Sequence, residues 1–298
     1  MAADRADDAH IPPDGPSGGK DDSAVPGRAA PAETRSRDEY YLSLREKVAA
    51  GQRSTVAEEQ VRAENWTETA ELSRWMWTEY RRRWPPGDRT DGTRSLDRAD
   101  DDRVDAECDR VAGREREKIS PALRDVESHD PARHLVGFED RLKGRDRIKE
   151  KVCDTIRDFD RSPEEAVALV RDTIRYTFQY QETRYTRGVR ADIERMQGRG
   201  FELDKLKNSW SGEQYRGINS QWIDPATGQR FEVQFHTRIS FEAKQLTHDA
   251  YERLRTLETD KFEELVLEAF QKKVAMAVPV PSGALGISDH PERRENAG

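Results

Sequence analysis

The most informative part of the chain runs from residue 215 to residue 237 and reads YRGINSQWIDPATGQRFEVQFHT. Two runs within it, 217–223 and 231–235, have the apolar and aromatic content of strands, and the later run alternates apolar and polar residues. Between them, residues 224–228 read DPATG, a composition typical of a tight turn. The stretch therefore predicts a β-hairpin whose second strand has one polar and one apolar face.

Strand and helix signals continue on both sides of this hairpin. Strand-like runs lie at 134–142, 173–179 and 202–206, and helical periodicity lies at 144–158, 187–198, 240–257 and 260–276. Ser162, Pro163 and Glu165 form a helix-start signal for a helix that runs to Leu169. Strands embedded among helices predict an α+β fold with a mixed, mainly antiparallel β-sheet flanked by helices.

The composition divides the chain into four expected segments. Residues 1–36 are rich in Pro and Gly and read as a disordered tail. Residues 37–118 read as a helical extension that contains an acidic linker at 87–102. We expect one folded domain over 119–277 and a flexible tail over 278–298. Within the extension, helices are expected from Asp38, over 55–83 and over 104–118.

The charge and hydropathy of the chain exclude several classes of protein. Of its 298 residues, 34% are hydrophobic and 37% are charged, and the mean hydropathy is −1.02. No apolar stretch is long enough for a membrane span, and Cys108 and Cys153 are too few for a disulfide scaffold. The net charge is −8, and residues 131–298 hold 29 basic against 29 acidic residues, which disfavours nucleic acid as the main partner. We expect a cytoplasmic protein without a membrane partner, and export as an effector stays open.

Two carboxylates stand at positions suited to metal binding. Asp172 directly precedes an apolar strand, and Glu232 shares the polar face of the hairpin with Gln234. Two acids on neighbouring strands can hold Mg²⁺, which prefers hard oxygen ligands and often bridges to phosphate. The same spacing also fits a solvated Glu on a surface strand, and the spacing alone does not choose between the two.

Basic residues gather at the end of the expected strand 134–142 and along the next helix. They are Arg141, Lys143, Arg145, Arg147, Lys149 and Lys151. Such a junction suits a polyphosphate, because arginine and helix N-terminal amides both bind phosphate oxygens. Four acidic residues within 139–150 nearly cancel this charge, so composition alone favours a solvated helix face.

Tyr215 and two histidines are further candidates. Tyr215 lies between a polar loop and a strand, where an aromatic side chain either stacks on a base or packs in the core. His236 and His248 have no third His or Cys near them at ligand spacing, which makes a zinc site improbable.

Five motifs, in this order, resemble the RelA/SpoT-type alarmone synthetase domain. They are Arg141-x-Lys143 with Ile148 and Lys151, Asp172 with Arg175, Lys207-Asn208-Ser209-Trp210, Tyr215-Arg216-Gly217-Ile218-Asn219-Ser220, and Phe231-Glu232-Val233-Gln234-Phe235-His236-Thr237. The last two are similar to the family's GY(R/K)(S/G)IH stretch and its E-(I/V)-Q-x-(R/H)-T strand. The resemblance spans residues 120–255.

The chain also departs from the family pattern. Asp172 stands three residues before Arg175 rather than five, and Gln214 and Asn219 replace a Gly and a His. The family's hydrolase domain is not apparent, since residues 1–119 contain one histidine, His10.

The resemblance implies transfer of the β,γ-pyrophosphate of ATP to the 3′-hydroxyl of a purine nucleotide, giving (p)ppGpp or (p)ppApp and AMP. It implies that Asp172 and Glu232 bind Mg²⁺, and that Glu232 also takes the hydroxyl proton. The implied ATP-binding residues are Arg141, Lys143, Arg147, Lys151 and Arg175. The implied acceptor-site residues are Tyr215, Asn219, Lys207, His236 and Gln234.

Two other functions stay open at this point. The acceptor of the pyrophosphate can be the 3′ end of tRNA, which would make the protein a toxin, although the neutral charge of residues 131–298 argues against a large RNA. Alternatively, the domain binds nucleotides or a partner protein without catalysis. The residues do not choose between guanosine and adenosine acceptors, and a homo-oligomer or an antitoxin partner also stays open.

Overall fold

A computed structural model describes residues 55–84, 95–255 and 259–291, with side chains from residue 64 onward. All of them belong to one compact unit, residues 52–298. The predicted disordered tail at 1–36 and the helix predicted from Asp38 lie outside the described residues.

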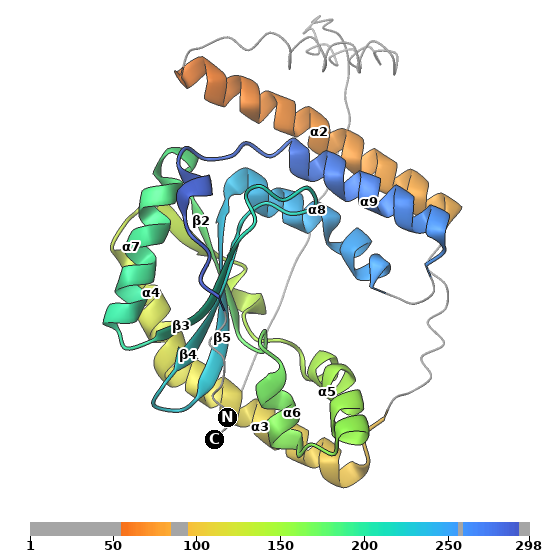
Figure 1. Ribbon diagram of the computed structural model, residues 1–298, viewed down its shortest axis with the longest axis vertical. Helices are drawn as coiled ribbons and strands as arrows, with labels where there is room; N and C mark the ends of the chain where they lie inside the picture. The colour runs from red at the N-terminus through yellow and green to blue at the C-terminus, as the bar shows by residue number, and fades with distance from the viewer. Residues whose placement is uncertain (1–54, 85–94, 256–258, 292–298) are drawn as a thin grey trace, which may run out of the picture. The chain divides into compact units, whose positions relative to one another are not determined.

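Five strands form one mixed sheet in the order β1-β2-β5-β4-β3 (Figure 1). The strands are β1 (Arg133–Val136), β2 (Arg175–Tyr180), β3 (Glu202–Asn208), β4 (Ile218–Asp224) and β5 (Gln229–Thr237). The β2–β5 pair is parallel and the other three pairs are antiparallel. The predicted α+β class with a mainly antiparallel sheet is therefore confirmed.

The hairpin β4–β5 forms as predicted. The amides of Thr227 and Gly228 both donate to the carbonyl oxygen of Asp224, at 3.2 and 2.8 Å. Gly228 has φ 68°, a left-handed conformation that glycine adopts without the steric cost of a Cβ atom. The turn thereby sets the register that pairs Gln221 with Glu232 across the two strands.

The two faces of β5 have different chemistry. Phe231, Val233 and Phe235 are fully buried on the apolar face, where the rings of Phe235 and Phe178 stack. Tyr185 of α7 (Tyr185–Gly198) donates to the Phe235 carbonyl at 2.9 Å, so α7 covers this face. Glu232, Gln234 and His236 lie on the opposite face, as their alternation predicts.

Helix α8 (Arg238–Leu254) covers the polar face of β5. It begins directly after β5 with a capping box, in which Thr237 and Ser240 bind each other's backbone amides. Ser240 contacts His236, and Lys244 donates to Gln234, both from one side of α8. The polar side chains of β5 therefore lie between the sheet and this helix.

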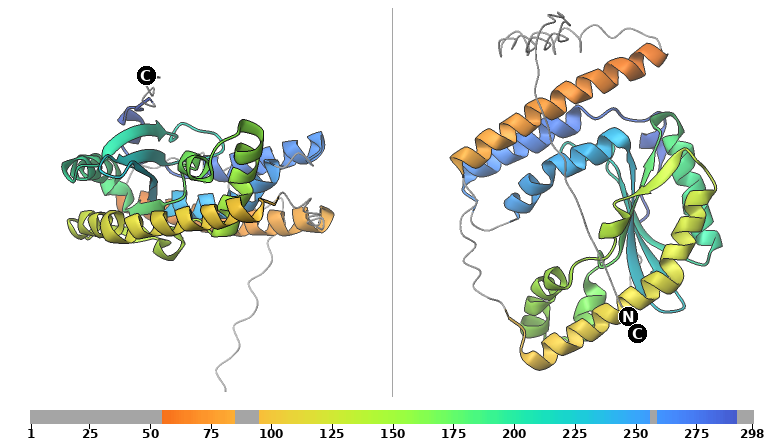
Figure 2. Two further views of the ribbon diagram at one scale, coloured as in Figure 1. Left: turned by 90° about the horizontal axis from the view of Figure 1, so that it is seen from below. Right: turned by 180° about the vertical axis from the view of Figure 1, so that it is seen from behind.

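The remaining helices agree with most of the predicted ranges. They are α2 (Thr55–Arg83), α3 (Arg98–Arg114), α4 (Ser120–Ser128), α5 (Arg145–Phe159), α6 (Pro163–Leu169) and α9 (Lys261–Met276). Ser162 and Glu165 form the capping box of α6 that the sequence signal predicts. Helix α2 lies alongside α9 (Figure 2), where the rings of Trp77 and Phe270 stack and Tyr80 donates to Glu263. No helix among the described residues is long and apolar enough to cross a membrane.

Two predicted ranges differ from the structure. The strand expected over 134–142 ends at Val136, because Gly137 turns into the left-handed region at φ 61° and a 3-10 turn follows at Phe138–Asp140. The helix expected over 104–118 begins at Arg98, since the Asp97 side chain accepts from the amide of Asp100 and caps it. It continues through a π-helical turn, Glu115–Ile119, into α4.

Two expected segments also differ in part. Residues 98–102 of the expected acidic linker 87–102 belong to α3, and residues 85–94 lie outside the described residues. The described part of the flexible tail expected at 278–298 packs on the domain: Val278 and Ala284 are buried, and the backbone of His290 pairs with Leu206 of β3. The described part of this segment is therefore held on the domain, with a backbone bridge to the edge strand β3.

The apolar face of β5 supplies a stability prediction. Phe235 is 0% exposed, whereas Phe262 is 65% exposed on α9. We expect Phe235→Ala to lower the free energy of unfolding by about 3–5 kcal/mol, because it removes a packed ring and leaves a cavity. Urea unfolding followed by circular dichroism measures this, with Phe262→Ala as the matched control, expected within about 0.5 kcal/mol of the parent. Equal losses in the two variants would contradict the assignment of this face to the core.

Candidate active site

Arg175 joins the two carboxylates that the sequence singles out. Its Nη2 lies 2.7 Å from Oδ2 of Asp172, and its Nε lies 2.9 Å from Oε1 of Glu232. The parallel register pairs Arg175 of β2 with Glu232 of β5, and Asp172 lies in the turn just before β2. Asp172 and Glu232, distant in sequence, therefore meet at one guanidinium.

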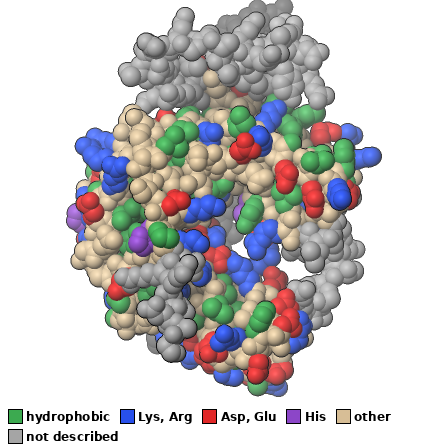
Figure 3. Space-filling view, viewed as in Figure 1, with side chains coloured by type: hydrophobic (Ala, Val, Ile, Leu, Met, Phe, Trp, Pro, Cys, Tyr) green, Lys and Arg blue, Asp and Glu red, His purple; other side chains and the backbone are tan. Residues whose placement is uncertain are grey.

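Two lysines complete the surroundings of Asp172. Lys143 Nζ and Lys151 Nζ each lie 2.9 Å from its carboxylate, and the Asp172 side chain is 15% exposed. Burial alone would raise the pKa of Asp172, but hydrogen bonds from Lys143 and Lys151 and the charge of Arg175 outweigh it and lower that pKa to about 2. In the view of Figure 3, Lys and Arg side chains surround a hollow near the centre of the molecule.

Backbone contacts explain why the two lysines reach Asp172. The Lys143 amide donates to the Thr173 carbonyl at 2.9 Å, and Leu142 pairs with Ile174, so this segment lies antiparallel to the start of β2. Helix α5 begins two residues after Lys143 and carries Lys151 on its second turn. Burial lowers the pKa of Lys143, and this effect outweighs that of Asp172, which raises the pKa.

Glu232 is 8% exposed, and both of its oxygens accept hydrogen bonds. Oε1 accepts from Arg175 and from the side-chain amide of Gln234, and Oε2 accepts from Gln221 Nε2 at 3.0 Å. Lys244 of α8 donates to Gln234 Oε1 at 2.5 Å. Such donors offset the cost of removing a carboxylate from water.

Tyr215, Asn219 and His236 form a second cluster. The Tyr215 hydroxyl donates to Asn219 Oδ1 at 2.7 Å and lies 2.8 Å from His236 Nε2. Since that single proton goes to Asn219, Nε2 of a neutral His236 donates and its Nδ1 accepts from Ser240. Burial lowers the pKa of His236 well below its ordinary value, which keeps the ring neutral.

Gly217 permits the close approach of this cluster. A Cβ atom at Gly217 would lie 2.7 Å from Cε1 of His236, closer than side-chain atoms approach each other. Its φ of 155° is also one that residues with a side chain rarely adopt. Glycine is therefore the residue that lets the loop place Tyr215 against His236.

Three of the expected site residues make no side-chain contact with the Asp172 cluster in the structure. Arg141 binds Glu115 of the π-helical turn at 2.7 Å and stacks over the Phe138 ring. Arg147 is exposed on α5 and contacts Glu150. Lys207 is exposed on β3, where its backbone pairs with Asn219. The structure thus joins Lys143, Lys151 and Arg175 at Asp172 but not these three.

The sequence analysis missed Gln221 and Lys244. Gln221 could have been found, because the hairpin register places it opposite Glu232 on the same face. Lys244 lies one turn after Ser240 on α8, and helical periodicity alone does not tell which polar position meets the buried amide of Gln234.

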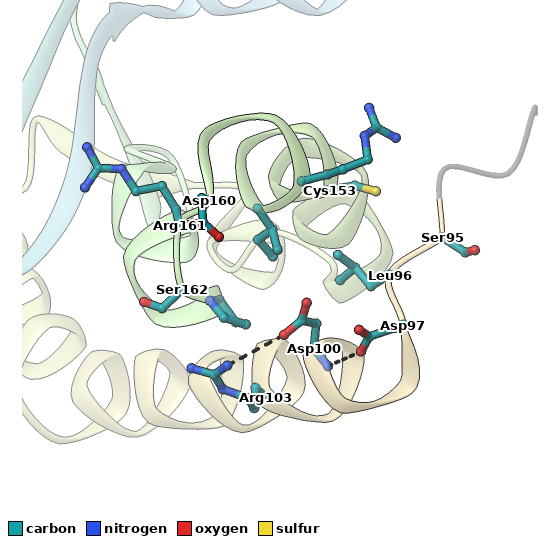
Figure 4. A pocket seen from close by; sticks show the side chains of 12 residues that line it. Ser95, Leu96, Asp97, Asp100, Arg103, Cys153, Asp160, Arg161 and Ser162 are labelled. Carbon is teal, nitrogen blue, oxygen red and sulfur yellow. Dashed lines mark hydrogen bonds and ion pairs between the residues drawn. The ribbon is translucent and has the colours of Figure 1, made fainter.

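A separate cavity of about 520 Å³ lies between the start of α3 and helices α5 and α6 (Figure 4). It contains none of the site residues, and its charges largely satisfy each other: Arg103 pairs with Asp100, while Asp97 caps α3. This cavity is therefore not the reactive centre.

The donor set of the carboxylate pair fits Mg²⁺. Asp172 and Glu232 supply carboxylate oxygens that already converge on one positive group, the guanidinium of Arg175. Mg²⁺ is commonly held by one or two carboxylates together with substrate phosphates and water. No cluster of three or more His, Cys, Asp or Glu suited to a metal occurs within residues 55–84, 95–255 and 259–291, so phosphates would have to supply further ligands.

The low pKa of Asp172 predicts a pH-dependent contribution to stability. Its carboxyl is ionised in the folded protein down to about pH 2, against an ordinary value of 3.8. Its stabilising effect is therefore complete above pH 3.8 and is lost as the pH falls toward 2. We expect Asp172→Asn to cost about 2 kcal/mol at pH 7 and little at pH 2, measured by urea unfolding at both pH values.

The exposed Asp146 offers a matched control for that experiment. Asp146→Asn should change the free energy of unfolding by less than about 0.5 kcal/mol at either pH. A loss for Asp172→Asn that stays constant from pH 7 to pH 2 would rule out the ion pairs as its cause.

No family model matches the sequence, and no curated protein matches it. Among solved structures, the chain is similar to the small alarmone synthetase 1 from Bacillus subtilis, at 15% identity and TM-score 0.39 over 59% of this chain and 89% of that one. It is similar to a GTP pyrophosphokinase family protein from Streptococcus pneumoniae, at 16% identity and TM-score 0.40 over 61% and 90%. For the Bacillus protein bound to its product pppGpp, the values are 13% and 0.37 over 56% and 88%. These proteins are of the kind that the sequence motifs resemble.

Proposed function

We propose that this protein transfers the β,γ-pyrophosphate of ATP to the 3′-hydroxyl of a purine nucleotide. The observation that carries the proposal is the convergence of Asp172 and Glu232 on Arg175, beside two lysines that bind Asp172. A buried and a partly buried acid within a cluster of cations suit a magnesium-bound polyphosphate. The five ordered motifs and their resemblance to RelA/SpoT-type synthetases supply the reaction class.

The cations would bind the donor. Lys143, Lys151 and Arg175 would exchange part of their contacts with Asp172 for phosphate oxygens of ATP, for which lysine and arginine are suited. Asp172 and Glu232 would hold Mg²⁺, which when bound supplies positive charge at the transferred phosphates. Arg141 would join the donor site only by leaving Glu115.

Glu232 would act as the general base. The 3′-hydroxyl oxygen attacks the β-phosphorus of ATP. The bond between the β-phosphorus and the α,β-bridging oxygen breaks, and AMP leaves with that oxygen. Glu232 accepts the proton that the hydroxyl loses. Oε2 is suited to this step because, among the described side chains, only Gln221 donates to it.

Tyr215 would mark the acceptor subsite. Asn219 and His236 hold its hydroxyl, so its ring is fixed in orientation before a purine stacks on it. Gln234 would orient Glu232, and Lys207 would approach the acceptor phosphates from β3.

The first test is product analysis. Mass spectrometry after incubation with ATP, Mg²⁺ and each of GDP, GTP, ADP and ATP should detect AMP together with a pyrophosphorylated nucleotide. We expect Glu232→Gln to lower kcat by at least about 100-fold with an unchanged fold, because the amide can neither take the proton nor bind Mg²⁺ well. Glu268→Gln, on the exposed side of α9, is the matched control.

Three results would each refute part of the proposal. A folded Glu232→Gln variant with full activity would remove Glu232 from catalysis. Absence of AMP release from the parent protein would remove the enzymatic function. Labelling of tRNA from γ-³²P-ATP, without labelling of free nucleotides, would replace the proposed acceptor.

The acceptor subsite gives a separate prediction. We expect Tyr215→Ala to raise KM for the acceptor nucleotide about 5- to 100-fold and to leave KM for ATP within about twofold, because base stacking on an aromatic ring contributes about 1–3 kcal/mol. Tyr215→Phe keeps the ring and should largely retain acceptor KM, as steady-state kinetics with each substrate varied will measure. Equal increases in both KM values would place Tyr215 outside the acceptor subsite.

A further inference from the structure

Lys244 makes a contact that the proposed reaction does not yet use. It extends from α8 to the polar face of β5, where its Nζ donates to Oε1 of Gln234 at 2.5 Å. The Phe241 ring lies 5.6 Å from Nζ, and Lys244 and Tyr215 line one small cavity between the loop 214–216, α8 and α9. Its hydrogen-bond partner is therefore an amide, not a carboxylate.

The direction of the hydrogen bonds from Lys244 to Glu232 is fixed by chemistry. An ammonium group only donates, and an ionised carboxylate only accepts. The amide of Gln234 between them must therefore turn its oxygen to Lys244 and its NH₂ to Glu232, as the structure has it. Without the ammonium group, Oε1 of Gln234 loses its donor, and only the hydrogen bond to Glu232 holds the amide in this orientation.

The charge of Lys244 supports this role near neutral pH. Burial and, to a lesser extent, the charge of Arg175 of β2 lower the pKa of Lys244 to about 8, against the opposing charge of Glu232 of β5. At pH 7 the amine is thus mainly protonated, the form that can only donate.

We propose that Lys244 is a positioning residue, whose ammonium group fixes the Gln234 amide so that Oε1 of Glu232 is held and Oε2 is left for the reaction. Oε1 receives hydrogen bonds from Arg175 and Gln234, whereas Oε2 receives one from Gln221. A carboxylate oxygen accepts about two hydrogen bonds, so Oε1 is saturated and Oε2 is not. This inference rests on the proposed function for the role of Glu232, but the contact itself is tested without activity.

The kinetic test uses Lys244→Met, which keeps the length of the side chain and removes the donor. We expect kcat to fall about 10- to 100-fold, the range typical of residues that orient a metal or catalytic ligand, with KM for ATP and acceptor within about twofold. Lys244→Arg, which retains a donor, should recover at least half of the lost activity on a logarithmic scale. Lys272→Met, at an exposed lysine that pairs with Glu213, is the control and should match the parent.

A double variant separates positioning from a general structural role. If Lys244 acts through Gln234, then Lys244→Met combined with Gln234→Ala should lose no more kcat than Gln234→Ala alone. Losses that multiply in the double variant, or a Lys244→Met variant with unchanged kcat, would overturn the proposal.

A spectroscopic test stands apart from the enzymatic function. In protein labelled with ¹⁵N-glutamine, the Gln234 side-chain amide signal is identified by its loss in Gln234→Ala. We expect Lys244→Met to shift or broaden that signal and Lys272→Met to leave it in place. An unchanged signal in a folded Lys244→Met variant would refute the positioning role, whereas a shifted signal in a protein that releases no AMP would refute only the proposed function.

Discussion

The guanidinium of Arg175 is the group on which the arrangement of the site depends. It binds Asp172 and Glu232 at once, and it can do so because β2 and β5 are parallel neighbours in which Arg175 and Glu232 are register partners. A slip of one residue would turn either side chain to the apolar face of the sheet. The hydrophobic packing of Phe178 against Phe235 prevents that slip, so the core on one face fixes the chemistry on the other.

Much of this arrangement follows from the sequence, and the physical reason is the two-residue period of strands. Alternation in 231–235 predicts that Glu232 and Gln234 share a face, and the hairpin turn at 224–228 predicts which strand pairs with it. The proximity of Asp172 to Glu232 cannot be predicted from a local pattern, since it depends on a parallel pairing between strands that are distant along the chain. The pattern of residues leaves a shared Mg²⁺ site as one of two interpretations, and the family resemblance is what favours it.

The residues that sequence reasoning missed or placed elsewhere share a cause. Lys244 and Arg141 each have a side chain long enough to choose among several partners, and the choice depends on tertiary packing. Arg141 binds Glu115, which a π-helical turn directs inward, and no helix-start signal or periodicity reveals such a turn. The same π-helical turn explains why the structure shows no break at the expected boundary after residue 118. One helical run continues from α3 through that turn into α4.

The charge balance of the site favours an anionic ligand. Lys143, Lys151, Arg175 and Lys244 surround the two carboxylates of Asp172 and Glu232, so the cations outnumber the acids by two within a chain whose net charge is −8. Partly buried cations in excess repel each other, and the lowered pKa values of Lys143 and Lys244 reflect that repulsion together with burial. An incoming anion with several charges relieves it. The field of this site therefore favours an anion with several charges, such as the proposed polyphosphate, although the whole chain is acidic.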